Sequence, residues 1–208
     1  MVKKILAVDD FTPGSADNWI VETDGAPEET VVVFGDGCVD AQSPDGITLW
    51  YKTPFSGNYR IEYDVEFVLG GAPHERLSDM NCFWSASDPA HPENFFAERS
   101  LRGAFSTYNP LHLYYVGYGG NYNTTTRFRK YLGTSKDIIT EYTDRDHLLK
   151  ENEIYHVAIE MENGFVRYFV NGECLVNYFD AECYPGGYFG FRTVRSHVRM
   201  RRFRAAEL

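Results

Sequence analysis

The sequence is poor in cysteine and contains no metal-binding spacing. Its four cysteines are far apart and form no Cys-x-x-Cys or Cys/His pattern, so we expect neither a zinc site nor a disulfide framework. The first apolar run, residues 5–8, ends at Asp9. A run this short makes neither a signal peptide nor a membrane span. We therefore expect a cytoplasmic protein with free thiols and no membrane partner.

Basic residues are also scarce. The chain has 20 Lys and Arg against 30 Asp and Glu, a formal charge of −10, which argues against a nucleic-acid partner held by bulk electrostatics. An anionic ligand would need a local basic site. The signature patterns of serine hydrolases, nucleotide-binding loops and zinc proteases are absent, which leaves those activities without support.

No cofactor is expected from the sequence, with one alternative left open. Four loop carboxylates could bind a divalent cation through oxygen, but they follow no calcium-loop spacing. They are Asp79, Asp88, Glu93 and Glu98.

Aromatic residues and alternating segments are what the sequence does have. Tyr, Phe and Trp make up 16% of the chain, and such residues favour strands and also supply surfaces on which sugars stack. Residues 59–67 alternate apolar and charged side chains without a fault, as in a half-buried antiparallel strand. Nine similar runs are 30–34, 47–52, 81–86, 111–117, 126–132, 155–161, 165–170, 187–194 and 198–203.

Turn signals separate these runs, and Asn163-Gly164 in particular predicts a type I′ hairpin. Only residues 144–151 show a pattern compatible with a short helix. Many short strands without crossover helices predict an all-β fold, a jelly-roll sandwich of two antiparallel sheets. With no repeat and no linker, we expect a single domain spanning residues 1–208. The polar loops at 70–76 and 87–103 are where ligand contacts would lie.

The densest cluster of polar and aromatic residues spans 108–131. We assume that residues 111, 113 and 115 face the core, so alternation places the next residues along that strand on the open face. These residues are His112, Tyr114 and, past Val116, Tyr118. The following strand would aim Arg127, Arg129 and Tyr131 at the same face.

This patch has the residue types that bind an acidic sugar. Tyrosine rings stack on sugar C–H faces, Asn121 and Asn123 can bind hydroxyl groups, and arginine pairs with a uronate carboxylate. The alternative is a tyrosine-rich sheet with arginine side chains lying over it and an inert, hydrogen-bonded His112. The convergence of several such residues favours the binding interpretation.

A second basic cluster lies near the C-terminus, at 190–204. For its later arginines, Arg199, Arg201, Arg202 and Arg204, we prefer a structural role, as a basic edge strand that discourages sheet-to-sheet pairing. Arg192 and His197 remain candidates for ligand binding. The carboxylates of strand 59–67, Glu62, Asp64 and Glu66, are best explained as a solvated face rather than as a glycosidase pair.

Four segments resemble the YesU-like family of uncharacterised bacterial proteins. They are residues 80–89, 108–115, 126–129 and 187–192, with Asn109, Leu111, His112, Phe128 and Arg129 matching its Asn-x-Leu-His and Phe-Arg elements. The resemblance implies a concanavalin-like, galectin-like jelly roll associated with rhamnogalacturonan utilisation, and hence pectic or related uronate-containing glycans. Residues 116–125 depart from that pattern, so the roles of Tyr118 and Asn121 depend on the residue-level argument.

Two classes of function follow. The first is a lyase acting by β-elimination next to a uronate: Arg129 or Arg127 with Asn121 neutralises the carboxylate, and His112 or Tyr118 removes the α-proton. The second is a lectin-like protein that only binds, and a glycoside hydrolase is a third possibility. The candidate catalytic residues are His112, Tyr118 and Arg129. The candidate binding residues are Trp84, Tyr114, Asn121, Arg127, Tyr131, Arg192 and His197. We expect the lyase, with an acidic oligosaccharide as partner.

Overall fold

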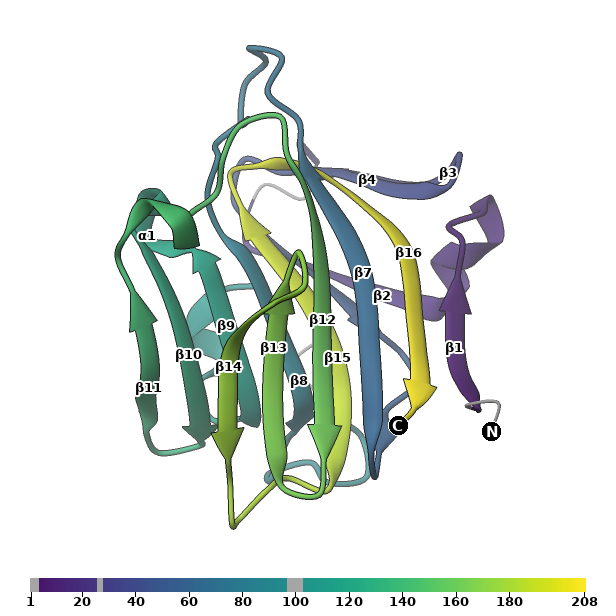
Figure 1. Cartoon of the computed structure of the whole chain (residues 1–208). Coiled ribbons are helices and arrows are strands. Elements are labelled where there is room, and N and C mark those ends of the chain that lie inside the picture. Colours follow the sequence, from purple (N-terminus) through teal and green to yellow (C-terminus); the bar gives the residue numbers. More distant parts are fainter. Residues whose placement is uncertain (1–3, 26–27, 97–102) are drawn as a thin grey trace.

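Two antiparallel sheets are stacked face to face in the computed structural model, which describes residues 4–25, 28–96 and 103–208 (Figure 1). In order, sheet 1 contains β14 (Glu173–Phe179), β13 (Phe165–Val170), β12 (Ile154–Glu162), β7 (Tyr59–Phe67), β16 (His197–Glu207), β4 (Cys38–Gln42) and β3 (Val31–Gly35), and β1 (Ile5–Asp9) also pairs with β16.

Sheet 2 lies behind β12 and β13 in Figure 1. In order, it contains β11 (Lys136–Tyr142), β10 (Thr125–Leu132), β9 (His112–Gly119), β8 (Met80–Ser87), β15 (Gly186–Val194), β5 (Gly46–Tyr51) and β2 (Trp19–Thr23), and β6 (Phe55–Ser56) also pairs with β15. The predicted all-β sandwich of two antiparallel sheets is confirmed.

Helical structure in the described residues is limited to one or two turns. Three are 3-10 turns: η1 (Pro13–Asn18), η2 (Phe105–Tyr108) and η3 (Arg145–His147), the last within the segment where the sequence allowed a short helix. The fourth, α1 (Gly120–Asn123), joins β9 to β10 with positive φ at Asn121, Tyr122 and Asn123. Asparagine tolerates this left-handed conformation better than most residues. No helix in the described residues is long and apolar enough to cross a membrane.

The hairpin predicted at Asn163-Gly164 joins β12 to β13. Both residues have positive φ, 49° and 84°, and Glu162 pairs with Phe165 across the turn, as a type I′ turn requires. Asn171 and Gly172 repeat the arrangement between β13 and β14.

The main core fills the space between the sheets. Alternate residues of β7, such as Ile61 and Val65, pack against alternate residues of β8 and β9, such as Trp84 and Val116.

The four cysteines all fall in the described ranges, and each is a free thiol.

A second, smaller core covers part of the outer face of sheet 2. Trp50 and Phe83 point away from the main core and pack against Tyr108, with ring centroids 5.6 and 5.2 Å from its ring. Tyr108 ends η2, and Leu111 follows it. Sheet 2 is therefore buried on both faces over much of its area.

The arginine-rich strand β16 is not an edge strand, so that expectation is wrong. It lies between β7 and β4, and its arginines pair with carboxylates on those strands: Arg199 with Asp40, Arg201 with Glu66. Paired charges make a basic strand compatible with a central position. Glu62 is half-buried and Asp64 buried in the same network.

Candidate functional site

A row of polar residues crosses the outer face of sheet 2 from edge to edge. Directly paired residues on antiparallel strands present their side chains on one face, and here one residue from each of seven strands pairs with the next. This polar row is Glu22, Thr48, Arg192, Asn81, Gly117, Arg127 and Glu141. Its two arginines flank Asn81 and Gly117.

The next row on the same face is mostly apolar. It consists of Ile20, Trp50, Gly190, Phe83, Tyr115, Arg129 and Ile138. Part of it lies under the second core, and Tyr115 and Arg129 lie at the margin of that cover, where the aromatic surface meets the polar row.

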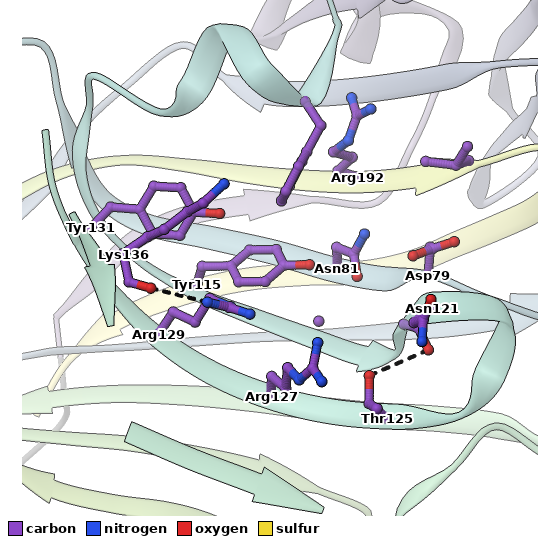
Figure 2. Close-up of a pocket in the computed structure, with 14 residues that line it drawn as sticks. Asp79, Asn81, Tyr115, Asn121, Thr125, Arg127, Arg129, Tyr131, Lys136 and Arg192 are labelled. Atoms are coloured by element: carbon purple, nitrogen blue, oxygen red, sulfur yellow. Dashed lines mark hydrogen bonds between the residues drawn. The ribbon is translucent and has the colours of Figure 1, made fainter. Parts of the chain in front are cut away.

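A pocket of about 310 Å³ opens where the two rows meet. Figure 2 shows Arg127 and Arg129 on one side and Arg192 on the other, with Asn81 and Tyr115 between them. The remaining lining residues are Asp79, Phe105, Gly117, Gly120, Asn121, Thr125, Tyr131, Lys136 and Val194. Seven elements thus contribute to one small cavity, which lies at the lower end of the size range of ligand pockets, about 300–1,000 Å³.

Three cations of this pocket have no carboxylate within 4.0 Å in the described part of the chain. Arg129 donates to the Lys136 carbonyl at 2.9 Å, and the Lys136 ammonium donates to Asn109 Oδ1 at 3.0 Å. Arg192 is 1% exposed and donates to Thr48 Oγ1 at 3.0 Å and to the Gly103 carbonyl. Neutral oxygens therefore satisfy some donors of these cations, and no described carboxylate forms a direct ion pair with them.

The other two charged residues of the lining are already paired. Arg127 forms an ion pair with Glu141. Asp79 accepts hydrogen bonds from Arg76 and from the Ser78 hydroxyl at 2.8 Å. The net charge of the pocket is positive, in a chain whose formal charge is −10.

Burial disfavours the charged phenolate form of the two tyrosines of the pocket. Burial raises the pKa of Tyr131 to about 12 and raises that of Tyr115 well above its ordinary value. Both phenols are therefore protonated at neutral pH.

Five of the residues that we predicted to bind or act on a ligand lie together in this pocket. They are Asn121, Arg127, Arg129, Tyr131 and Arg192. The alternation predicted for strand 126–132 is confirmed, because Phe128 packs into the main core while its two arginine neighbours line the pocket.

The alternation predicted for strand 111–117 is wrong by one residue. Tyr114 and Tyr118 point into the main core, where Tyr114 donates to Asp180 at 2.6 Å. Trp84 is fully buried there and contacts Met161. The residue of β9 that reaches the pocket is Tyr115. Apolar side chains on both faces of β9 removed the signal that distinguishes the two faces.

The two candidate histidines also lie elsewhere. His112 is on the same side of β9 as Tyr114 and stacks on Tyr184, with ring centroids 5.6 Å apart. His197 belongs to sheet 1, where it bridges Asp40 at 2.7 Å and Glu75 at 3.4 Å. Neither of them lines the pocket.

Several lining residues escaped the sequence argument. Asn81 and Gly117 had a usable signal, since a lone polar residue in an apolar run and a glycine inside a strand both indicate a special environment. Lys136 and Phe105 had none, because only the three-dimensional fold brings them to β10.

The described residues offer no metal site. No group of three or more His, Cys, Asp or Glu side chains in these ranges could hold a metal ion. Of the loop carboxylates considered above, Glu98 lies outside the described residues.

The fold is shared with structures of known carbohydrate-binding proteins. A galectin-like protein of unknown function from Bacillus subtilis superimposes with a TM-score of 0.78 at 15% identity, over 98% of this chain and 96% of that chain. The carbohydrate-binding module CBM66 from Bacillus subtilis gives 0.55 at 12% identity, over 91% and 96%. The VIP36 exoplasmic/lumenal domain, bound to Ca²⁺ and Man3GlcNAc, gives 0.64 at 12% identity, over 97% and 90%. Identities this low establish a galectin-like, concanavalin-like fold only.

The sequence comparisons identify a family but no function. No curated protein matches the chain significantly. The model of a domain of unknown function, DUF6250, matches residues 41–203. This match spans most of both sheets and the whole polar row except Glu22, and the chain therefore belongs to the DUF6250 family.

Proposed function

We propose that the protein is a lectin-like module that binds the acidic sugar of a uronate-containing glycan in the sheet 2 pocket. One observation carries the proposal: Arg129, Lys136 and Arg192 face one cavity without a carboxylate partner in the described residues. Cations in a partly buried site are costly without a counter-ion. A ligand carboxylate would supply it.

The rest of the pocket suits a sugar ring. Phe105, which is half-buried, and the edge of the Tyr115 ring offer aromatic surface for the C–H face of a sugar. Asn121 and Thr125 offer hydrogen-bonding groups for its hydroxyls. Two proteins of the same fold carry carbohydrate binding in their descriptions. The resemblance to YesU-like proteins points to pectic glycans, whose galacturonate units carry the required carboxylate.

Binding is better supported than elimination. A lyase needs a base beside the α-carbon of the bound uronate, and the two bases we predicted, His112 and Tyr118, lie outside the pocket. Burial raises the pKa of the tyrosines that do line it, which makes them weaker candidates for the base.

The test is calorimetric titration with saturated oligogalacturonates and with the same oligosaccharides after reduction of their carboxyl groups to alcohols. We expect binding of the acidic form and at least about ten-fold weaker binding of the reduced form, since charge-assisted hydrogen bonds are lost. Equal affinity for both forms, or no binding of either, overturns the proposal. The ultraviolet absorbance of an unsaturated uronate, followed in the same samples, should stay flat; its growth would establish a lyase instead.

A further inference from the structure

Two neighbouring residues at the centre of the polar row have buried polar atoms without partners. Asn81 and Arg192 pair directly across β8 and β15. Within the described residues, Asn81 Oδ1 and Arg192 Nε are buried and make no hydrogen bond. The two side chains are only 3% and 1% exposed, and both line the pocket.

The fold itself gives no reason for an amide at position 81. Met80 and Cys82, on either side of it, point into the main core, and Phe83, two residues on, packs its apolar ring on the outer face. Nearly all buried polar side-chain atoms in proteins are paired, so an unpaired one that also lines a pocket is a candidate for contact with a ligand. An apolar side chain would satisfy the burial of this position better.

The two unpaired atoms are complementary in kind. Arg192 Nε–H is a donor and Asn81 Oδ1 is an acceptor. Directly paired residues of an antiparallel sheet have Cα atoms about 4.5–5.5 Å apart, so both side chains can reach one group of a ligand. A hydroxyl both donates and accepts a hydrogen bond, whereas a carboxylate only accepts.

Asn81 and Arg192 both line the pocket, and the Tyr115 hydroxyl lies beside Asn81, over Gly117. Figure 2 shows the Tyr115 hydroxyl directed towards Asn81, with Arg129 beyond the tyrosine. A sugar whose carboxylate meets Arg129 and Lys136 would lie across the Tyr115 ring, and its far side would face Asn81 and Arg192.

We infer that Asn81 and Arg192 form a hydroxyl-recognition subsite, which makes the pocket specific for an acidic sugar with one particular hydroxyl unsubstituted. This inference rests on the proposed function, because it takes the carboxylate to lie at Arg129 and Lys136. It adds that substitution at that hydroxyl, by a methyl or acyl group or by a glycosidic bond, prevents binding. Asn81 acts here as a specificity-determining residue.

The experiment measures displacement of a labelled oligogalacturonate by methyl galacturonoside and by its monodeoxy derivatives, each lacking one hydroxyl. With the unaltered protein, one derivative should bind about ten-fold more weakly than the parent, the value of one buried hydrogen bond. The variant Asn81→Leu should bind the parent about ten-fold more weakly and lose nothing further with that same derivative, since the partner of the missing hydroxyl is already gone.

Thermal unfolding separates this role from a structural one. Asn81→Leu should unfold at the same temperature as the unaltered protein or higher, because it removes a buried unpaired amide. Thr193→Val is the matched control: the Thr193 hydroxyl is also buried and unpaired in the described residues, but it does not line the pocket, so its removal should leave binding unchanged.

Three results would overturn the inference while leaving the proposed function intact. They are normal binding by Asn81→Leu, equal affinities across the deoxy series, and losses from the variant and the deoxy sugar that simply add. If Asn81→Leu does not fold, the deoxy series with the unaltered protein still decides. Absence of any oligogalacturonate binding overturns the proposed function itself.

Discussion

The outer faces of the two sheets both carry arginines but use them in opposite ways. On sheet 1, arginines and carboxylates alternate across neighbouring strands in a network that we call the ion-pair ladder. Its pairs are Arg167 with Glu160 and Glu162, Arg60 with Glu62 and Glu160, Arg202 with Asp64, Arg201 with Glu66, and Arg199 with Asp40. On sheet 2, three cations share a pocket, and none of them has a carboxylate partner among the described residues.

The charges of sheet 1 stabilise the fold, whereas those of sheet 2 are available to bind a ligand. A ladder whose charges neutralise one another exerts little field on a ligand, and each of its half-exposed pairs adds at most about 1 kcal/mol to stability. Unpaired cations in a concave, partly apolar site keep their field for a ligand. The same residue type thus belongs to the scaffold on one face and to the site on the other.

The sharpest way to break this comparison is to remove two cations from each face. Replacing Arg129 and Lys136 together by glutamine should weaken oligogalacturonate binding at least about 100-fold, since each charge-assisted contact is worth about 1.5–3 kcal/mol, and should leave the unfolding temperature unchanged. The matched double variant Arg201→Gln with Arg204→Gln, on β16, should bind normally. Calorimetry and thermal unfolding of both proteins decide, and equal losses of affinity would show that only overall charge matters.

A smaller effect is expected from the glycine beneath the pocket. A Cβ atom at Gly117 would collide with the Tyr115 hydroxyl and come within 3.1 Å of Asn81 Oδ1. Gly117→Ala should therefore push the Tyr115 ring into the cavity and reduce affinity about ten-fold, the cost of an overpacked contact of about 1–3 kcal/mol. Gly14→Ala, whose Cβ would approach only Thr12 at 3.9 Å, is the control. Unchanged affinity of Gly117→Ala would place the ligand away from Tyr115.

The smallest expected effect is on the pH dependence of stability, through Asp40 of the ion-pair ladder. Burial tends to raise the pKa of Asp40, but hydrogen bonds from Arg199 and His197 outweigh it and hold the pKa below its ordinary value of 3.8. A carboxylate with a lowered pKa stabilises the folded state above its unfolded pKa, and this stability is lost as the pH falls through the folded value.

Arg199→Gln should therefore lower the unfolding temperature by about 1–3 °C at neutral pH, as one half-exposed pair allows. The difference from the unaltered protein should shrink once the pH drops below 3.8, and glycan binding at neutral pH should not change. A difference that persists in acid would mean that Arg199 acts through packing rather than through charge.

Strand positions could be predicted from the sequence because alternation is a local property. The segment 59–67 matches β7 (Tyr59–Phe67) residue for residue, and the Asn-Gly turn fixed the hairpin that follows β12. Strands without clean alternation, such as β11 (Lys136–Tyr142) and β14 (Glu173–Phe179), were missed. Both form strands because they pair with a neighbouring strand, β10 and β13 respectively, and not because their own sequence alternates.

The side of the sheet to which a site residue points was predictable only where one face of its strand is polar. In β10, arginines alternate with Phe128, and the prediction holds. In β9, Leu113 and Tyr115 pack under the second core while Tyr114 and Val116 pack into the main core. When both faces of a strand are apolar, alternation does not show which face points into the main core. Tyr114 and Tyr118 were therefore assigned to the site in place of Tyr115.

The second core also couples the pocket to the segment that covers sheet 2. Phe105 packs against this core through Phe83 and Tyr115, and it forms one wall of the pocket. A ligand that contacts Phe105 binds when this residue is packed on sheet 2, so by linkage the bound ligand makes local unfolding of residues 105–111 less favourable. Backbone amides of residues 105–111 should then exchange with solvent more slowly in the liganded protein, while those of the ion-pair ladder keep their rates.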